Sequence, residues 1–192
     1  MMVEIEHTPN PDTLKFLPGK KVSEVGPIEF LKNDKSIKVS LANKILSLEG
    51  TVMVFFGEDF ITVKKEKDLN WEDMKHGIIS EINDYYSKGN EVVVGKDLRL
   101  VKILSESVSD SKPVESNAVV NKINEILDSK IRPAVARDGG DIIFESFDKG
   151  IVYLTLKGAC VGCPSSTATL KQGIENLLKH YFPEVQSVQE II

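Results

Sequence analysis

The stretch Lys157-Gly-Ala-Cys-Val-Gly-Cys-Pro-Ser-Ser166 holds the only two cysteines of the 192-residue chain, Cys160 and Cys163, spaced C-x-x-C. Alternating apolar residues predict a strand over 151–156 before it, and helical periodicity predicts a helix over about 164–180 after it. The proline that follows the motif suits the first turn of a helix, so Cys163 is expected near the N-cap. The positive end of the helix dipole would then lower the pKa of the thiols and favour thiolate.

Two thiolates make only half of a metal site, because structural zinc and iron–sulfur clusters take roughly four protein ligands. The three histidines, His7, His76 and His180, are scattered along the chain. His180 ends the helix that Cys163 begins, about 25 Å away at about 1.5 Å rise per residue. A symmetric dimer would bring a second cysteine pair and complete the set. This hypothesis requires both cysteines to lie within reach of a neighbouring molecule.

Composition places the chain among soluble proteins, with 41% hydrophobic and 28% charged residues. The net charge of −5 argues against nucleic-acid binding, which depends on Lys and Arg. The basic run Lys64-Lys65 with Lys67 is interpreted as solvated surface. No apolar run approaches the ~20 residues that span a membrane, and the first residues have neither signal-peptide nor transit-peptide character. We expect a bacterial cytoplasm, with the mitochondrial matrix as the location if the source is eukaryotic.

The periodicity predicts an α+β protein of two small mixed α+β domains joined by a flexible linker. The expected boundaries are residues 1–89, a linker over 90–113, and residues 114–192. Within the linker, 105–113 is polar and serine-rich, whereas the apolar residues of 91–104 could make an edge strand or pack across the first domain. In the first domain we expect strands near 3–7, 14–16, 52–56 and 60–64, and helices that Ser40 and Asn70 cap.

In the second domain, an i, i+4 ridge predicts a helix that Pro133 interrupts. Its apolar residues are Val119, Ile123, Leu127 and Ile131. A turn at 138–141 leads into a strand over 142–147, a hairpin turn and the strand before the cysteines. Leu170, Ile174, Leu177, Leu178 and Tyr181 are expected on the apolar side of the following helix, and 185–191 predicts a last strand.

The second half resembles the NifU C-terminal domain, through Ile131-Arg-Pro-Ala-Val-Ala-Arg-Asp-Gly-Gly-Asp141 and Leu156-Lys-Gly-Ala-Cys-Val-Gly-Cys-Pro-Ser-Ser166. The first half is similar to the N-terminal domain of Nfu proteins. The stretches that carry this similarity are Thr8-Pro-Asn-Pro-Asp-Thr-Leu-Lys-Phe16, Leu48-Glu-Gly50 and Val54-Phe-Phe-Gly-Glu-Asp-Phe-Ile-Thr-Val63. The chain lacks the further cysteine-rich domains of full-length NifU, which places it with the short Nfu type.

The resemblance implies an iron–sulfur cluster scaffold or carrier rather than an enzyme. Cys160 and Cys163 stand where that family has its ligands, which implies a [4Fe–4S] cluster bridged between two subunits of a homodimer, or a [2Fe–2S] cluster. The implied partners are apo iron–sulfur acceptor proteins and upstream cluster-assembly proteins, with no nucleic acid and no membrane. The family gives no clear chemical role to the first domain.

Two alternatives stay open from the residues alone. A strand, C-x-x-C and helix in this order also occur in thiol–disulfide oxidoreductases, although no βαβ unit precedes the motif here. Four thiolates of a dimer would equally suit a structural zinc ion. Arg132, Arg137, Asp138 and Asp141 belong to the family signature, but helix-end capping and turn formation explain them better than cluster contact.

Overall fold

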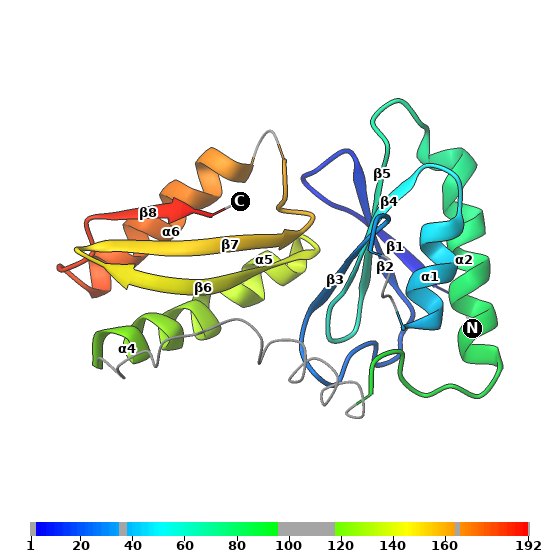
Figure 1. Cartoon of the computed structure of the whole chain (residues 1–192), viewed down its shortest axis with the longest axis horizontal. Coiled ribbons are helices and arrows are strands. Elements are labelled where there is room, and N and C mark those ends of the chain that lie inside the picture. Colours follow the sequence, from blue (N-terminus) through cyan, green and yellow to red (C-terminus); the bar gives the residue numbers. More distant parts are fainter. Residues whose placement is uncertain (1–2, 35–37, 96–117, 164–165, 192) are drawn as a thin grey trace.

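The computed structural model describes residues 3–34, 38–95, 118–163 and 166–191, and it shows two α+β domains side by side (Figure 1). The first domain contains β1 (Glu4–His7), β2 (Thr13–Leu17), β3 (Ile28–Leu31), α1 (Ser40–Ser47), β4 (Thr51–Phe56), β5 (Ile61–Lys65) and α2 (Trp71–Ser87). The second contains α4 (Ala118–Ile126), the π-helical stretch η1 (Leu127–Ile131), α5 (Arg132–Arg137), β6 (Gly140–Asp148), β7 (Ile151–Gly158), α6 (Ser166–Tyr181) and β8 (Ser187–Glu190).

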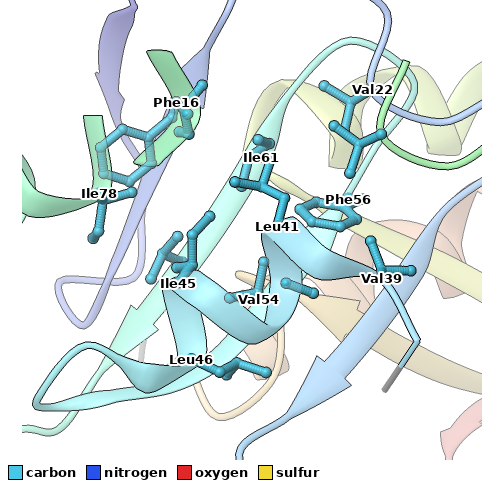
Figure 2. Close-up of a cluster of buried hydrophobic side chains, with 14 of the residues drawn as sticks. Phe16, Val22, Val39, Leu41, Ile45, Leu46, Val54, Phe56, Ile61 and Ile78 are labelled. Atoms are coloured by element: carbon cyan, nitrogen blue, oxygen red, sulfur yellow. The ribbon is translucent and has the colours of Figure 1, made fainter. Parts of the chain in front are cut away.

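The first domain is an antiparallel sheet of order β1-β2-β5-β4-β3 with α1 and α2 against one face. Strand alternation decides which side chains face these helices, because successive residues point to opposite faces. Phe16, Ile61 and Val54 point to the helix side and are fully buried with Leu41 and Ile45 of α1 (Figure 2). This core fixes the sheet, and it therefore also fixes what the opposite face presents.

The opposite face of the first sheet is directed at the second domain (Figure 1). Here the alternating positions carry polar residues, Lys15 of β2 and Thr62 and Lys64 of β5. Beside them lies a small apolar group, Met53, Phe55 and Phe60, against which Ala136 of α5 packs. Glu29 of β3 completes this face, which we call the docking face.

The second domain is a sheet of order β6-β7-β8, in which β7 pairs antiparallel with β6 and parallel with β8. Val152, Leu154 and Leu156 of β7 alternate with half-buried residues, so the sheet buries one face. Leu127 of η1 and Leu178 of α6 pack into this core. The hairpin of β6 and β7 extends toward the first domain and carries the cysteine loop to it (Figure 1).

Most predicted elements are confirmed, including Asn70 as the N-cap of α2, which accepts from the Glu72 amide. The helix is interrupted as expected: η1 ends at Ile131, and α5 begins at Arg132, one residue before Pro133. Three predictions are wrong. Ser40 lies inside α1 and makes no cap, Tyr181 is 44% exposed, and Lys64 and Lys65 are not solvated surface, since Lys65 is only 6% exposed and Lys64 is half-buried.

Two further differences concern short segments. β3 is an element that the sequence did not predict. Val93 and Val94, in the predicted linker, pack into the first core, while the larger part of that linker lies outside the described residues. The residue boundaries of the domains stay a prediction.

Candidate functional site

The two cysteines lie in the tight turn that follows β7, at the end of the hairpin nearest the first domain. β7 ends at Gly158, whose φ of +66° belongs to the left-handed region. A Cβ atom there would lie 2.7 Å from the Gly139 carbonyl oxygen, so the backbones approach too closely for any side chain. Gly162, between the cysteines, has a φ of +67°. These glycines fold the C-x-x-C segment back over the edge of the sheet.

The two cysteines form no disulfide, and both are buried. Cys160 is 4% exposed and Cys163 is 1% exposed, so the expectation that they lie within reach of a neighbouring molecule is wrong for this arrangement of the chain. The Cys160 sulfur packs over Gly140, where a Cβ atom would lie 2.6 Å from it. Cys160 is part of the second domain's own hydrophobic core.

A cavity of about 400 Å³ lies beside the two thiols. Its walls come from the turn 159–163 and from η1, α5 and α6 of the second domain, and from Pro9 and Asn10 of the first. The lining residues are mostly apolar, with Asp138 and Lys130 as charged members. The cavity is thus a pocket of the second domain over which the first domain lies.

Burial raises the pKa of the Cys160 thiol to about 12, and the nearby carboxylates Asp138, Asp141 and Glu190 and the Cys163 thiol add to the effect. The predicted lowering of the thiol pKa is therefore wrong for Cys160. The helix that was expected to lower it, α6, begins at Ser166, beyond the cysteine turn. Pro164 lies outside the described residues. In this arrangement Cys160 is a neutral thiol.

Side chains of the first domain bind the main chain of the cysteine turn. Asn10 Nδ2 donates to the Ala159 carbonyl at 3.0 Å and lies 3.5 Å from the Val161 carbonyl. Lys64 Nζ donates to the same Val161 carbonyl at 3.0 Å. Asn10 is held ready for this contact, because its Oδ1 accepts from the Asp12 amide at 3.1 Å and closes an Asx turn.

Further interdomain bonds surround this contact on both sides. Thr62 Oγ1 donates to the Gly139 carbonyl at 2.7 Å, and Lys15 Nζ donates to the Arg137 carbonyl at 3.2 Å. On the other side of the hairpin, the Gly158 amide donates to Glu29 Oε2 at 2.8 Å. The Lys157 ammonium lies 3.4 Å from Glu29 Oε1. The docking face therefore binds the end of β7, which leads into the cysteine turn, and also the end of α5 and the turn that follows it.

The other residues of the predicted signature have structural contacts. Arg132 Nε donates to the Ile142 carbonyl at 3.1 Å, and its guanidinium pairs with Asp128 at 3.0 Å. Asp141 is buried beside it, and this burial raises the pKa of its carboxyl. Among the signature's charged residues only Asp138 lines the cavity with the cysteines.

No histidine joins the cysteines. His7, His76 and His180 are all exposed, on β1, α2 and the last turn of α6. Within the described ranges, no group of three or more His, Cys, Asp and Glu side chains is arranged to hold a metal ion. The two thiols of one chain accordingly remain an incomplete ligand set.

Sequence reasoning missed Asn10, Lys15, Thr62 and Lys64 as residues of this site. One signal was available for Thr62 and Lys64. They alternate with the apolar Ile61 and Val63 in a strand between two turns, so a polar face had to lie opposite the helix-covered face. Nothing in the alternation indicated that this face binds a second domain.

The described helices include none that is both long enough and apolar enough to cross a lipid bilayer.

Comparison with known families gives two matches on this chain. Residues 3–89 match the family described as "Scaffold protein Nfu/NifU N terminal", and residues 123–189 match "NifU-like domain". The two matches cover the two structural domains, in the order in which the structure shows them.

Curated proteins similar to the chain extend over almost its whole length. "NifU-like protein 4, mitochondrial" of Arabidopsis thaliana is 43% identical over 99% of this chain and 66% of its own length. "NFU1 iron-sulfur cluster scaffold homolog, mitochondrial" of Homo sapiens is 41% identical over 100% of this chain and 72% of its own length. The chain thus spans about two thirds of the length of these relatives.

Among solved structures, a Staphylococcus aureus protein is 32% identical over 42% of this chain and 98% of its own, with a TM-score of 0.38.

Proposed function

This chain belongs to the family of NifU-like proteins that carry an Nfu N-terminal domain, and on that premise we propose that it is a scaffold and carrier of iron–sulfur clusters. The single observation that supports the proposal is the pair of thiols beside a cavity in the NifU-like domain. The relatives that are named as iron–sulfur cluster scaffolds agree with it.

In the proposed complex, Cys160 and Cys163 of two chains bind one cluster, which is the cargo and not a resident cofactor. Clusters of the [2Fe–2S] and [4Fe–4S] types take roughly four cysteine thiolates, and one chain supplies two. We propose a [4Fe–4S] cluster, with [2Fe–2S] as the alternative. Iron binds the thiolate form, so loading releases the thiol protons.

A ligand set divided between two chains suits a carrier. Each chain holds only half of the cysteines, so the thiols of an acceptor can replace one pair at a time while the other pair keeps the cluster bound. The proposed partners are therefore a second copy of the chain, apo iron–sulfur proteins that receive clusters, and assembly proteins that supply them. The proposed role is not enzymatic, and a neutral, buried Cys160 thiol is a poor nucleophile for thiol–disulfide exchange.

Anaerobic reconstitution with iron and sulfide tests the proposal. Iron and sulfide counts, the absorption spectrum and the mass in solution should together give one cluster for two chains. Cys160→Ser and Cys163→Ser should each abolish stable cluster binding. His180→Ala is the matched control, because it removes a side chain that could bind metal from an exposed position far from the cavity, and it should load normally.

Other outcomes would contradict the proposal in different ways. A stable cluster on a strict monomer would refute the shared ligand set. Zinc in protein purified without air, with no uptake of iron and sulfide, would indicate a structural zinc site. Reduction of insulin disulfides that needs both cysteines and no metal would indicate an oxidoreductase.

For the compartment, we propose the mitochondrial matrix. The names of the relatives given above place those proteins in mitochondria, and the expected bacterial cytoplasm finds no support in them.

A further inference from the structure

We infer that the docking face of the first domain, together with the adjacent β1–β2 loop that carries Pro9 and Asn10, is a cap on the cysteine pair, and that its natural occupant is this chain's own cysteine turn. The cap and a second chain compete for the same surface of the NifU-like domain. The cap itself is independent of any metal, whereas its competition with a second chain rests on the proposed function.

The contacts are directed at the cysteine turn itself. Asn10 and Lys64 donate to the carbonyls of Ala159 and Val161, which immediately precede and follow Cys160. Asn10 is 1% exposed although it is an amide in a surface turn, so its burial depends on the second domain. A buried amide without partners is costly, and Asn10 finds its partners across the interface.

The same contacts exclude a second chain. Pro9 and Asn10 line the cavity that both cysteines line. A cluster shared by two chains must touch the cysteine sulfurs of both, and the second chain would have to enter through the space that these two residues fill. The closed chain and the bridged dimer therefore cannot exist together.

The interface between the two domains is largely polar, as in interfaces that open and close. A small apolar cluster around Met53, Phe55 and Phe60 takes in Ala136 of the second domain. Around this cluster lie hydrogen bonds and the ion pair of Glu29 and Lys157, whose side chains are 13% and 34% exposed. Polar interdomain interfaces of this kind resemble transient complexes, in which relative motion is expected.

Alkylation of the reduced apo protein by iodoacetamide, followed by mass spectrometry on the full chain without iron, tests the cap. Asn10→Asp keeps the oxygen that accepts from the Asp12 amide but turns an oxygen toward the two carbonyls. Loss of one hydrogen bond shifts the docking equilibrium of the two domains about fivefold toward the undocked state, and repulsion between the facing oxygens adds to this shift. We expect Cys160 and Cys163 to be alkylated about tenfold faster or more in Asn10→Asp.

Asn70→Asp is the matched control, since it introduces the same charge on the same domain and keeps the N-cap oxygen of α2. It should be alkylated within about twofold of the wild-type rate, because hydrogen bonds of the interface are untouched. Lys64→Met is the second variant, which removes the donor to the Val161 carbonyl and keeps a long side chain. Circular dichroism verifies that each variant is folded.

The cap is overturned if both folded interface variants are alkylated no faster than the wild type. It is also overturned if the folded wild type is alkylated as fast as the same chain in denaturant, because its thiols would then be exposed already. Faster alkylation without any cluster formation would leave the cap in place and refute the proposed function. If both hold, the interface variants form the bridged dimer faster than the wild type on reconstitution.

Discussion

Replacing Gly140 with alanine tests how closely the cysteine turn is packed on the sheet. The new Cβ atom would lie 2.6 Å from the Cys160 sulfur and 2.7 Å from the Lys157 carbonyl oxygen. The carbonyl belongs to β7, which the ladder with β6 holds in place, so it cannot move aside as a flexible side chain would. Overpacking of this kind costs about 1–3 kcal/mol, and we expect the upper half of that range because backbone is involved.

Urea unfolding followed by circular dichroism measures this loss, and thermal unfolding should show it as well. For a domain of about 60–100 residues, a loss of about 1 kcal/mol lowers Tm by about 4–8 °C. Gly173→Ala is the control, since this glycine is exposed in α6 and a Cβ atom there would meet nothing within 4 Å. It should stabilise the helix by about 0.5–1 kcal/mol. If Gly140→Ala proved as stable as Gly173→Ala, the cysteine turn would not be closely packed on Gly140.

The remaining predictions concern one hydrogen bond, one buried phenol and one core residue. Glu29→Ala removes the carboxylate that accepts from the Gly158 amide, so that amide should exchange with solvent about tenfold faster or more by NMR; unchanged exchange would contradict the contact. Burial raises the pKa of Tyr86, so its contribution to stability is complete below its ordinary value of about 10 and is lost as pH rises above that value. The free energy of unfolding should therefore fall more steeply above pH ~10 in the wild type than in Tyr86→Phe, and parallel pH profiles would count against this. Ile82→Ala removes a fully buried side chain from the first core and should lower the free energy of unfolding in urea by about 2–5 kcal/mol. A loss as small as that of a surface substitution would show that Ile82 is not packed in this core.

The periodicity of the sequence predicted most of the fold because each long element buries one face in its own domain. Asn70 capped α2 as expected, since an N-cap is a local feature of a few residues. β3 was missed for a physical reason. It has four residues, all half-buried or exposed, and it lies at the edge of the sheet. Its alternation of apolar and polar residues is therefore too short and too weak to predict a strand.

The site was predictable only in part. The two cysteines could be found because they are the only ones and are spaced C-x-x-C. Their protonation was predicted with the wrong sign, because burial outweighs the dipole of a helix that begins beyond them. Asn10 could not be found at all, because it contacts a carbonyl 149 positions away and a carbonyl is common to every residue.

The cap holds the cysteine turn by its peptide groups, and this leaves the identity of residue 161, which follows Cys160, largely free. Val161 offers only its carbonyl to Asn10 and Lys64, and its own amide donates to Gly158. Any amino acid except proline retains both groups. A protein engineer can therefore place a fluorescent or isotopically labelled residue at position 161 and observe docking of the two domains directly, without disturbing the bonds that hold them.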